Sequence, residues 1–262
     1  MSDAVVVAII SGAVAIVSGL PALGWTIYTW RAERRKTSLE QTLSHVTAAT
    51  KYTHTLDTII TTTRILNAEG DNETEVRVNG LRVSEGLSLN KIHMDLFTSG
   101  TFSAEAPPVL IETSRKGVCL DATLSTEQHY TCELGIYGGK QPDEAPLDYA
   151  YRFSAKKGYL LSRAAIKERF GSEALAYEYF EETIAVPVKH IRIAVSFPKD
   201  LMPNAFPIVT VAGLPQIAAA ERARAEAAFK VSGNVAAINL DDPQPGLRYL
   251  VCWDGTPKIS ST

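Results

Sequence analysis

The first thirty residues constrain the fold of this chain more than any other segment. Residues 4–30 contain no charged side chain. An uncharged, apolar segment of this length spans the ~30 Å core of a bilayer as a single helix. A cleaved signal peptide would carry Lys or Arg before its apolar core, and residues 1–3 contain neither. The sequence therefore predicts a retained transmembrane helix over residues 1–30.

The charges around the predicted span set its orientation. The basic residues Arg31, Arg34, Arg35 and Lys36 follow the span directly, and no basic residue precedes it. Positive residues favour the cytoplasmic side of a membrane. We therefore expect a single-pass protein of the inner (cell) membrane, with its N-terminus outside and its C-terminal domain in the cytoplasm. The three cysteines lack the spacing of a disulfide framework, which agrees with a reducing compartment.

Small residues recur along one face of the predicted span at alternating spacings of four and three. Such a face lets membrane helices approach closely, although Gly is frequent in any membrane helix and the stripe could arise by chance. We expect a homo-oligomer that packs through this face and meets membrane lipid with the opposite one. Whether the helices form a pore or only an anchor stays open. The predicted packing residues are Ala4, Ala8, Ser11, Gly12, Ala15, Ser18, Gly19 and Ala22.

The heptad rhythm of the span continues beyond the basic run. Leu39, Leu43 and Val46 keep the four-three spacing, which is typical of a continuous helix that packs against copies of itself. The sequence predicts a juxtamembrane helical stalk over residues 31–68, ended by the turn residues 69–72. The rhythm weakens after residue 52, because residues 53–66 are rich in β-branched side chains that favour strands.

The remainder of the chain alternates short strand-like runs with Pro and Gly turns. Residues 74–78 alternate apolar and polar side chains, and Asn79-Gly80 is a typical hairpin turn into residues 81–83. The predicted fold is a mainly-β module, a β-sandwich or barrel, with one or two short helices. We expect two β-rich lobes, residues 73–171 and 172–255, followed by a loose tail, residues 256–262. Helices are predicted over residues 163–170 and 217–228.

No catalytic or metal-binding motif is recognisable. The five histidines are scattered, and the sequence contains no HExxH, no CxxC, no nucleophile elbow and no P-loop. Residues 135–140 are rich in Gly and end in Lys140, but they lack the P-loop spacing and are interpreted as a hairpin loop. The sequence therefore predicts no catalytic residue, no metal and no cofactor.

Basic residues gather around the predicted helix 163–170, with Tyr149, Tyr151 and Tyr159 nearby in the sequence. Basic side chains can bind phosphate and aromatic rings can stack on bases, although charged runs usually face water. The formal net charge of −3 argues against general binding of duplex nucleic acid. The candidate ligand-binding residues are Lys156, Lys157, Arg163, Lys167 and Arg169.

The order of these parts resembles the single-pass transmembrane effectors of bacterial nucleotide-controlled anti-phage systems, of the Hailong or CBASS type. The resemblance implies that the cytosolic module senses a nucleotide or oligonucleotide made by a partner nucleotidyltransferase. It also implies that the oligomeric membrane helices disrupt the inner membrane or conduct across it. Two alternatives stay open: a membrane-tethered scaffold or adaptor whose β-sandwich binds a protein partner, and an unrecognised membrane-tethered enzyme.

Overall fold

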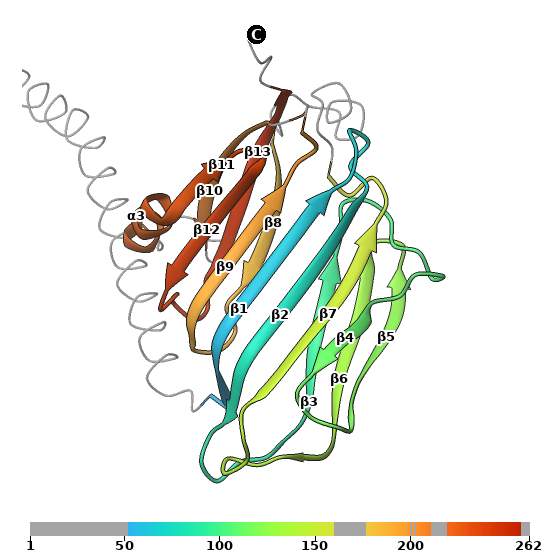
Figure 1. Ribbon diagram of the computed structural model, residues 1–262, viewed down its shortest axis with the longest axis vertical. Helices are drawn as coiled ribbons and strands as arrows, with labels where there is room; N and C mark the ends of the chain where they lie inside the picture. Colours follow the sequence, from blue (N-terminus) through green and yellow to red (C-terminus); the bar gives the residue numbers. More distant parts are fainter. Residues whose placement is uncertain (1–51, 160–176, 200, 202, 211–218, 258–262) are drawn as a thin grey trace, which may run out of the picture. The chain divides into compact units, whose positions relative to one another are not determined.

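The computed structural model describes residues 52–159, 177–199, 201, 203–210 and 219–257 of the chain (Figure 1). These residues form three β-sheets and the helix α3 (Ala219–Ala228). They belong to one compact unit. The description that follows is of this β-rich module.

The largest sheet has seven strands (Figure 1). Its central pair, β1 and β9, is parallel, and its other neighbouring pairs are antiparallel. In spatial order the strands are β11 (Phe229–Ser232), β12 (Val235–Asp241), β9 (Val188–Ser196), β1 (His54–Ile65), β2 (Asn72–Val83), β7 (Leu147–Ala155) and β4 (Val109–Thr113).

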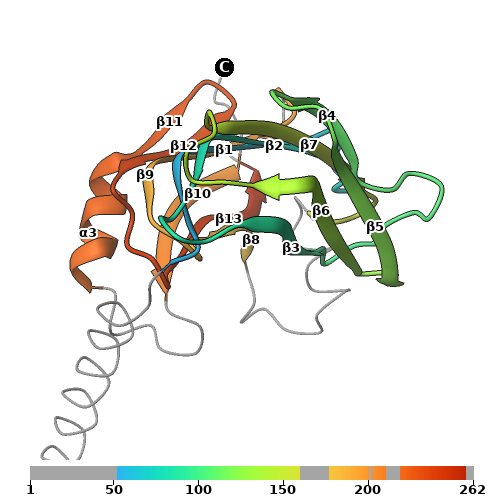
Figure 2. The same ribbon diagram turned by 90° about the horizontal axis from the view of Figure 1, so that it is seen from below.

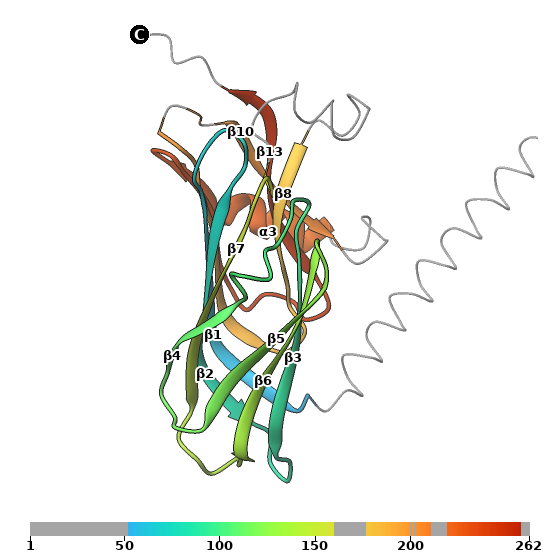
Figure 3. The same ribbon diagram turned by 90° about the vertical axis from the view of Figure 1, so that its right-hand side faces the viewer.

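Two three-stranded sheets cover one face of the large sheet (Figures 2 and 3). In order they are β10 (Pro203–Thr210), β13 (Arg248–Pro257) and β8 (Tyr177–Thr183), and β3 (Leu89–Phe97), β6 (His129–Lys140) and β5 (Val118–Thr126). Strand β10 contacts β11 and β12 at one end of the large sheet, and β5 contacts β4 at the other. Strands β8 and β3 are therefore the inner edges of the two small sheets. We call the boundary between these two strands, which no strand pairing bridges, the seam.

The core fills the space between the large sheet and the small ones as one continuous cluster. Beside β8, a chain of edge-to-face aromatic contacts joins Phe180 to Tyr159, Tyr159 to Trp253, and Trp253 to Phe197. The backbone N–H groups of residues 158 and 159 both donate to the carbonyl of Gly70. A Cβ atom on Gly70 would lie 1.9 Å from the backbone carbonyl oxygen of Tyr159, so this close approach requires glycine.

The structure corrects the predicted fold class. Among the described residues α3 is the one helix, and strands make up most of the rest. No helix in this part of the chain is long and apolar enough to cross a bilayer. The described residues therefore give no support to the predicted single-pass membrane protein or channel. The span over residues 1–30, its packing face and the first part of the stalk lie outside the described residues.

The predicted helical stalk over residues 31–68 is wrong where the structure describes it. Residues 54–65 form β1, which is paired on one side with β2 and on the other with β9. Two ladders satisfy the backbone groups of this Thr- and Ile-rich segment, and alternate side chains are buried. Tertiary pairing and β-branched composition therefore outweighed the weakening heptad rhythm.

Two finer expectations also fail. Asn79-Gly80 is not a hairpin turn but a bulge within the single strand β2, at the point where its pairing with β7 shifts register. Gly80 has a φ of +70°, and its N–H donates to Asp148 Oδ1 at 2.7 Å. The division into two lobes at residue 172 does not match the sheets, because β1, β2, β4 and β7 share the large sheet with β9, β11 and β12. Residues 256 and 257 of the expected tail belong to β13.

Candidate functional site

Polar side chains lie in the middle of the buried face of the large sheet, where an apolar core would be expected. Thr61 and Thr63 on β1 and Thr74 on β2 are fully buried. Thr63 pairs directly with Thr74, and their hydroxyl oxygens are 3.0 Å apart, a hydrogen bond. In the adjacent row Thr61 pairs with Val76, and Val76 pairs with Tyr151 on β7. This band of polar side chains has members on β1, β2 and β7, with Val76 between Thr61 and Tyr151.

A carboxyl group reaches this band from the opposite layer. Glu182 lies on β8, at the inner edge of its small sheet, beside the seam. The hydroxyl of Thr61 donates to Glu182 Oε2 at 2.9 Å. Glu178 and Phe180, at alternate positions of the same strand, are buried, whereas Tyr179 between them is exposed. The two-residue period of a strand therefore turns Glu182 towards the large sheet.

The environment of Glu182 makes it titrate near neutral pH. Burial raises the pKa of Glu182 to about 7; the hydrogen bond from Thr61 lowers this pKa in part, and the charge of Glu181 raises it. The residue is of intermediate exposure, so solvent still reaches a group that is surrounded by protein. Near pH 7 the carboxyl is about half protonated, and it can both donate and accept hydrogen bonds.

Two tyrosines on β7 complete the arrangement. Tyr149 and Tyr151 are 5% and 7% exposed. Burial raises the pKa of both phenols, and the charge of Glu182 raises it further. Neither hydroxyl forms a hydrogen bond with another of the described residues. We call these six residues the seam cluster: Thr61, Thr63, Thr74, Tyr149, Tyr151 and Glu182.

The seam cluster contains one group that is unfavourable as a purely structural feature. Burial of the Glu182 carboxyl raises its pKa, so the ionised group is destabilised in the folded protein. A carboxyl group whose pKa is moved this far by burial is a candidate functional group. The cluster is therefore the strongest candidate site in the described part of the chain.

A second buried carboxyl group, on α3, has a complete set of partners. Arg224 Nη1 donates to both oxygens of Glu221 at 3.0 and 2.7 Å, and the Tyr249 hydroxyl donates to Glu221 Oε1 at 2.7 Å. The Tyr249 oxygen in turn accepts the backbone N–H of Gln244 at 2.8 Å. We call Glu221, Arg224 and Tyr249 the helix anchor, because they join α3 to β13. This group has an evident structural role.

The predicted ligand-binding residues are only partly described. Lys156 Nζ lies 3.8 Å from Asp71 Oδ2, and the backbone N–H of Lys157 donates to Asp71 Oδ1 at 3.0 Å. The structure thus brings these two lysines to an acidic turn, and neither belongs to the seam cluster. Arg163, Lys167 and Arg169 lie outside the described residues.

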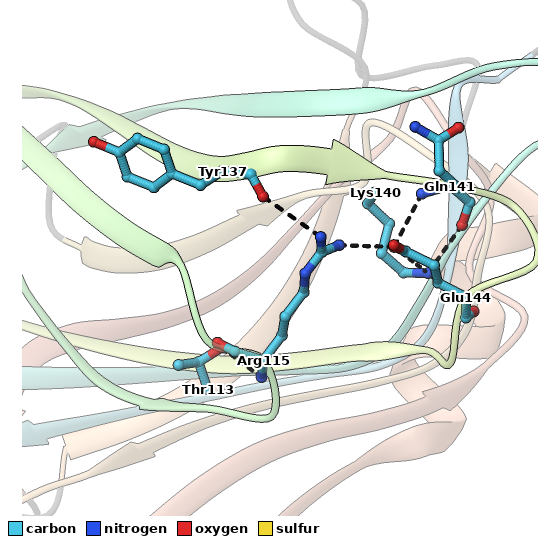
Figure 4. A network of polar contacts seen from close by, with 6 residues as sticks. All are labelled: Thr113, Arg115, Tyr137, Lys140, Gln141 and Glu144. Carbon is cyan, nitrogen blue, oxygen red and sulfur yellow. Dashed lines mark hydrogen bonds and ion pairs between the residues drawn. The ribbon is translucent and has the colours of Figure 1, made fainter.

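The Gly-rich run that ends in Lys140 belongs to β6 and not to a hairpin loop. The Lys140 side chain is 1% exposed, and its Nζ donates to the carbonyl oxygens of Gln141 and Glu144 (Figure 4). Arg115 Nη1 donates to Glu144 Oε2 at 2.7 Å, and the ring of Tyr137 points away from the group. Lys140 therefore holds the turn after β6 and leaves no free ammonium for a phosphate.

The histidines of the described residues are paired on the surface. His190 Nδ1 lies 2.7 Å from Asp241 Oδ1, and His129 Nε2 lies 2.8 Å from Asp95 Oδ1. Within the described ranges no three His, Cys, Asp or Glu side chains are grouped so that they could hold a metal ion. These pairs offer no nucleophile, and they are ordinary polar contacts of solvent-facing strands.

The centre of the candidate site carries no signal in the sequence. Thr61 and Thr63 fall in the predicted stalk, and Glu182 is not among the predicted site residues. The β8 sequence carries Glu at positions 178, 181 and 182, so acidic residues occur on both faces of the strand. Only the packing of β8 on β1 distinguishes the inward carboxyl groups from the outward one.

Comparison with known proteins adds little to this geometry. No protein-family model and no curated protein matches the sequence. Among solved structures, a candidate protease from Parabacteroides distasonis is 10% identical with a TM-score of 0.41, over 76% of this chain and 40% of that one. Native yeast LTA4 hydrolase is 7% identical with a TM-score of 0.38, over 76% and 29%. The chain spans less than half the length of these proteins, and at such scores the likeness carries no argument about function.

Proposed function

We propose that the β-rich module binds a small molecule at the seam cluster, and that its role is recognition. One observation carries the proposal. The Glu182 carboxyl accepts a hydrogen bond from Thr61, and burial raises its pKa to about 7. Its charge also raises the pKa of the buried Tyr149 and Tyr151, whose hydroxyls form no hydrogen bond with another of the described residues. A ligand that pairs with the carboxyl would offset the cost of its burial.

The surroundings of the cluster suit a small ligand. Ligand sites are mostly apolar, with a few polar groups that fix the orientation of the bound molecule. Here the rings of Tyr149 and Tyr151 and the buried Val76 between Thr61 and Tyr151 provide the apolar part. The carboxyl of Glu182 and the phenols provide the polar part. Phe102 and Phe153 stand beside Tyr130 and Tyr151 and extend the aromatic wall.

A catalytic role has weaker support. The Thr61 hydroxyl and the Glu182 carboxyl form the first two parts of a nucleophile-and-base arrangement. In such an arrangement a third group orients the base, and none of the described residues bonds to Glu182 in this way. Binding is therefore the proposal, and turnover of the bound molecule is one of the outcomes that would contradict it.

The wider functions expected from the sequence stay predictions. These are an effector role in anti-phage defence under a nucleotide signal from a partner nucleotidyltransferase, and the adaptor alternative. The proposal concerns the described module alone. The proposal keeps one part of the predicted effector role, a module that senses a ligand. It does not include the predicted membrane span.

A fragment screen tests the proposal. Ligand-observed NMR would compare binding of a small-molecule library to the full chain, to Glu182→Met and to Glu181→Gln. The methionine side chain has nearly the shape of glutamate and removes the carboxyl. Glu181 is the neighbouring carboxylate on the opposite face of β8, paired with Arg248, and serves as the matched control. We expect a set of fragments that binds the wild type and Glu181→Gln but not Glu182→Met.

Two results would contradict the proposal. The first is a screen in which every fragment that binds the wild type also binds Glu182→Met, which would place binding elsewhere. The second is chemical conversion of a bound fragment that stops in Glu182→Gln and in Thr61→Val, which would favour an enzyme.

A further inference from the structure

The bulge of β2 contains Asn79-Gly80, which is the one Asn-Gly pair in the sequence. Gly80 has a φ of +70°, and a Cβ atom on it would lie 2.1 Å from Asp57 Oδ2. Both features require glycine at this position. The Asn79 side chain has a partner as well, because its Nδ2 donates to Thr58 Oγ1 at 2.9 Å. The fold therefore places a chemically reactive dipeptide in the middle of its largest sheet.

An Asn-Gly pair can lose ammonia without a catalyst. The backbone nitrogen of the glycine gives its proton to water or hydroxide and attacks Cγ of the asparagine. The new N–Cγ bond forms, the bond between Cγ and Nδ2 breaks, and Nδ2 takes a proton from water and leaves as ammonia. Water then opens the cyclic imide at either carbonyl, which gives aspartate or isoaspartate. Glycine favours the attack because it has no Cβ to hinder it.

Three contacts oppose this reaction in the folded chain. The N–H of Gly80 donates to Asp148 Oδ1 at 2.7 Å, and a carboxylate beside the nitrogen disfavours loss of its proton. The hydrogen bond to Thr58 holds the side-chain amide of Asn79 away from the glycine. The pairing of Asn79 with Thr58 on β1 keeps the backbone extended, whereas ring closure needs the Gly80 nitrogen to rotate towards Cγ.

The carboxylate of this group is placed by the other edge of β7. The backbone N–H of Asp148 donates to Ser114 Oγ at 2.9 Å, and its carbonyl accepts the N–H of Ser114 at 2.9 Å. Strand β2 lies between β1 and β7 (Figure 1). Asp148 is exposed and Asn79 is of intermediate exposure, so a local separation of β7 from β2 would bring water to the Asn-Gly pair.

We propose that Asn79 is a modification site, at which deamidation is held back by the bond from Gly80 to Asp148 and proceeds when β7 separates locally from β2. This proposal is independent of the seam cluster. Aspartate at position 79 adds a carboxylate close to Asp57 and Asp148. Isoaspartate adds a methylene group to the backbone of β2 and disturbs its pairing with both neighbours. The modification would therefore weaken the large sheet irreversibly.

Peptide mapping by mass spectrometry of the full chain, incubated at pH 8, tests this proposal. Deamidation replaces an amino group with a hydroxyl group in the peptide that contains residue 79. The wild type is followed both folded and in guanidinium. Asp148→Ala removes the acceptor, and Asp148→Asn keeps an acceptor oxygen without the charge. Asp143→Ala, at an exposed carboxyl in the turn after β6, is the control. Hydrogen exchange of the Gly80 amide, followed by NMR, reports local opening in each variant.

We expect Asn79 to deamidate at least about tenfold more slowly in the folded wild type than in guanidinium, because the reaction requires local opening. Asp148→Ala should speed the reaction at least about tenfold, since it removes a charge-assisted hydrogen bond. Exchange of the Gly80 amide should rise with it. Asp148→Asn should speed the reaction by about threefold, because the neutral bond is weaker. Asp143→Ala should match the wild type.

Equal rates in the folded and unfolded wild type would overturn the proposal, because the fold would then give no protection. Equal rates in Asp148→Ala and Asp143→Ala would also overturn it, since Asp148 would have no special role. Should Asp148→Ala fail to fold, Asp148→Asn decides the question in its place, and a rate no higher than that of the wild type would refute the role of the carboxylate.

Discussion

Glu182 and Glu221 are two interior carboxyl groups of one small module, and their surroundings are opposites. Glu221 accepts three hydrogen bonds, from Arg224 and from Tyr249, and holds α3 against β13. Glu182 accepts one side-chain hydrogen bond, from Thr61, and burial raises its pKa to about 7. Glu221 thus stabilises the fold, whereas Glu182 destabilises the folded protein when its carboxyl ionises. The difference in satisfied hydrogen bonds separates a structural carboxylate from a candidate functional one.

The two groups are also neighbours through Tyr249. This residue is the cross-strand partner of Glu182 on β13, and its hydroxyl donates to Glu221. Substitutions at the two carboxyl groups should therefore be examined singly and together, because residues that share a partner do not always contribute additively.

The largest expected effect is at the helix anchor. Glu221→Ala removes three hydrogen bonds at once and leaves the Tyr249 hydroxyl without its acceptor. At about 1 kcal/mol for each hydrogen bond, we expect the free energy of unfolding to fall by about 3 kcal/mol, measured by guanidinium denaturation. Arg222→Gln breaks only an exposed pair with Glu226 on the same helix and should cost at most about 0.5 kcal/mol. Equal losses in the two variants would remove the structural role assigned to Glu221.

Next in size is the pH dependence contributed by Glu182. The pKa of Glu182 is about 7 in the folded protein, against about 4.5 for a glutamate in the unfolded chain, so the folded state binds more protons between these values. Stability from this group is therefore lost as pH rises from about 4.5 to about 7, by roughly 3 kcal/mol at most. Glu182→Gln should be more stable than the wild type at pH 8 and nearly equal at pH 4. Parallel stability curves for the two proteins from pH 4 to pH 8 would show that the carboxyl does not titrate as described.

A matched pair of Tyr→Phe substitutions sharpens the comparison. Tyr249→Phe loses a hydroxyl that donates to Glu221 and accepts from Gln244, so unfolding should become easier by about 1.5–2 kcal/mol. Tyr151→Phe removes a hydroxyl without a hydrogen-bond partner among the described residues and should change stability by less than about 0.5 kcal/mol. Thermal unfolding of both variants measures the contrast. A loss at Tyr151 as large as that at Tyr249 would mean that its hydroxyl has a structural partner.

The smallest expected effect concerns the hydrogen bond from Thr61. Thr61→Val keeps the side-chain shape and removes the donor to Glu182, so stability at pH 8 should fall by about 1 kcal/mol. The titration midpoint of Glu182, followed by carboxyl-carbon NMR, should move further upward. Thr62→Val, next to it on the exposed face of β1, is the control and should change neither quantity. An unchanged midpoint in Thr61→Val would show that this hydroxyl does not stabilise the carboxylate.

Local sequence signals predicted several strands well and the site poorly. The strand-like run over residues 74–78 lies within β2, and the helix predicted over residues 217–228 corresponds to α3, because alternation and Ala-rich composition are local properties. Strand β1 was misassigned because a heptad rhythm and a β-branched run overlap there. The bulge at Gly80 was read as a turn, since Asn-Gly is compatible with both.

By itself, the sequence determined that most of residues 73–255 would form short strands, because the spacing of apolar side chains and turn residues depends only on the chain. It contained no sign of which Glu of β8 would face inward, or that threonines of β1 would meet it. That was decided by the packing of a small sheet on a large one, which brings Glu182 to Thr61 across 121 positions of the chain. Burial, and with it the raised pKa that marks the candidate site, is a property of that packing and exists only in the folded protein.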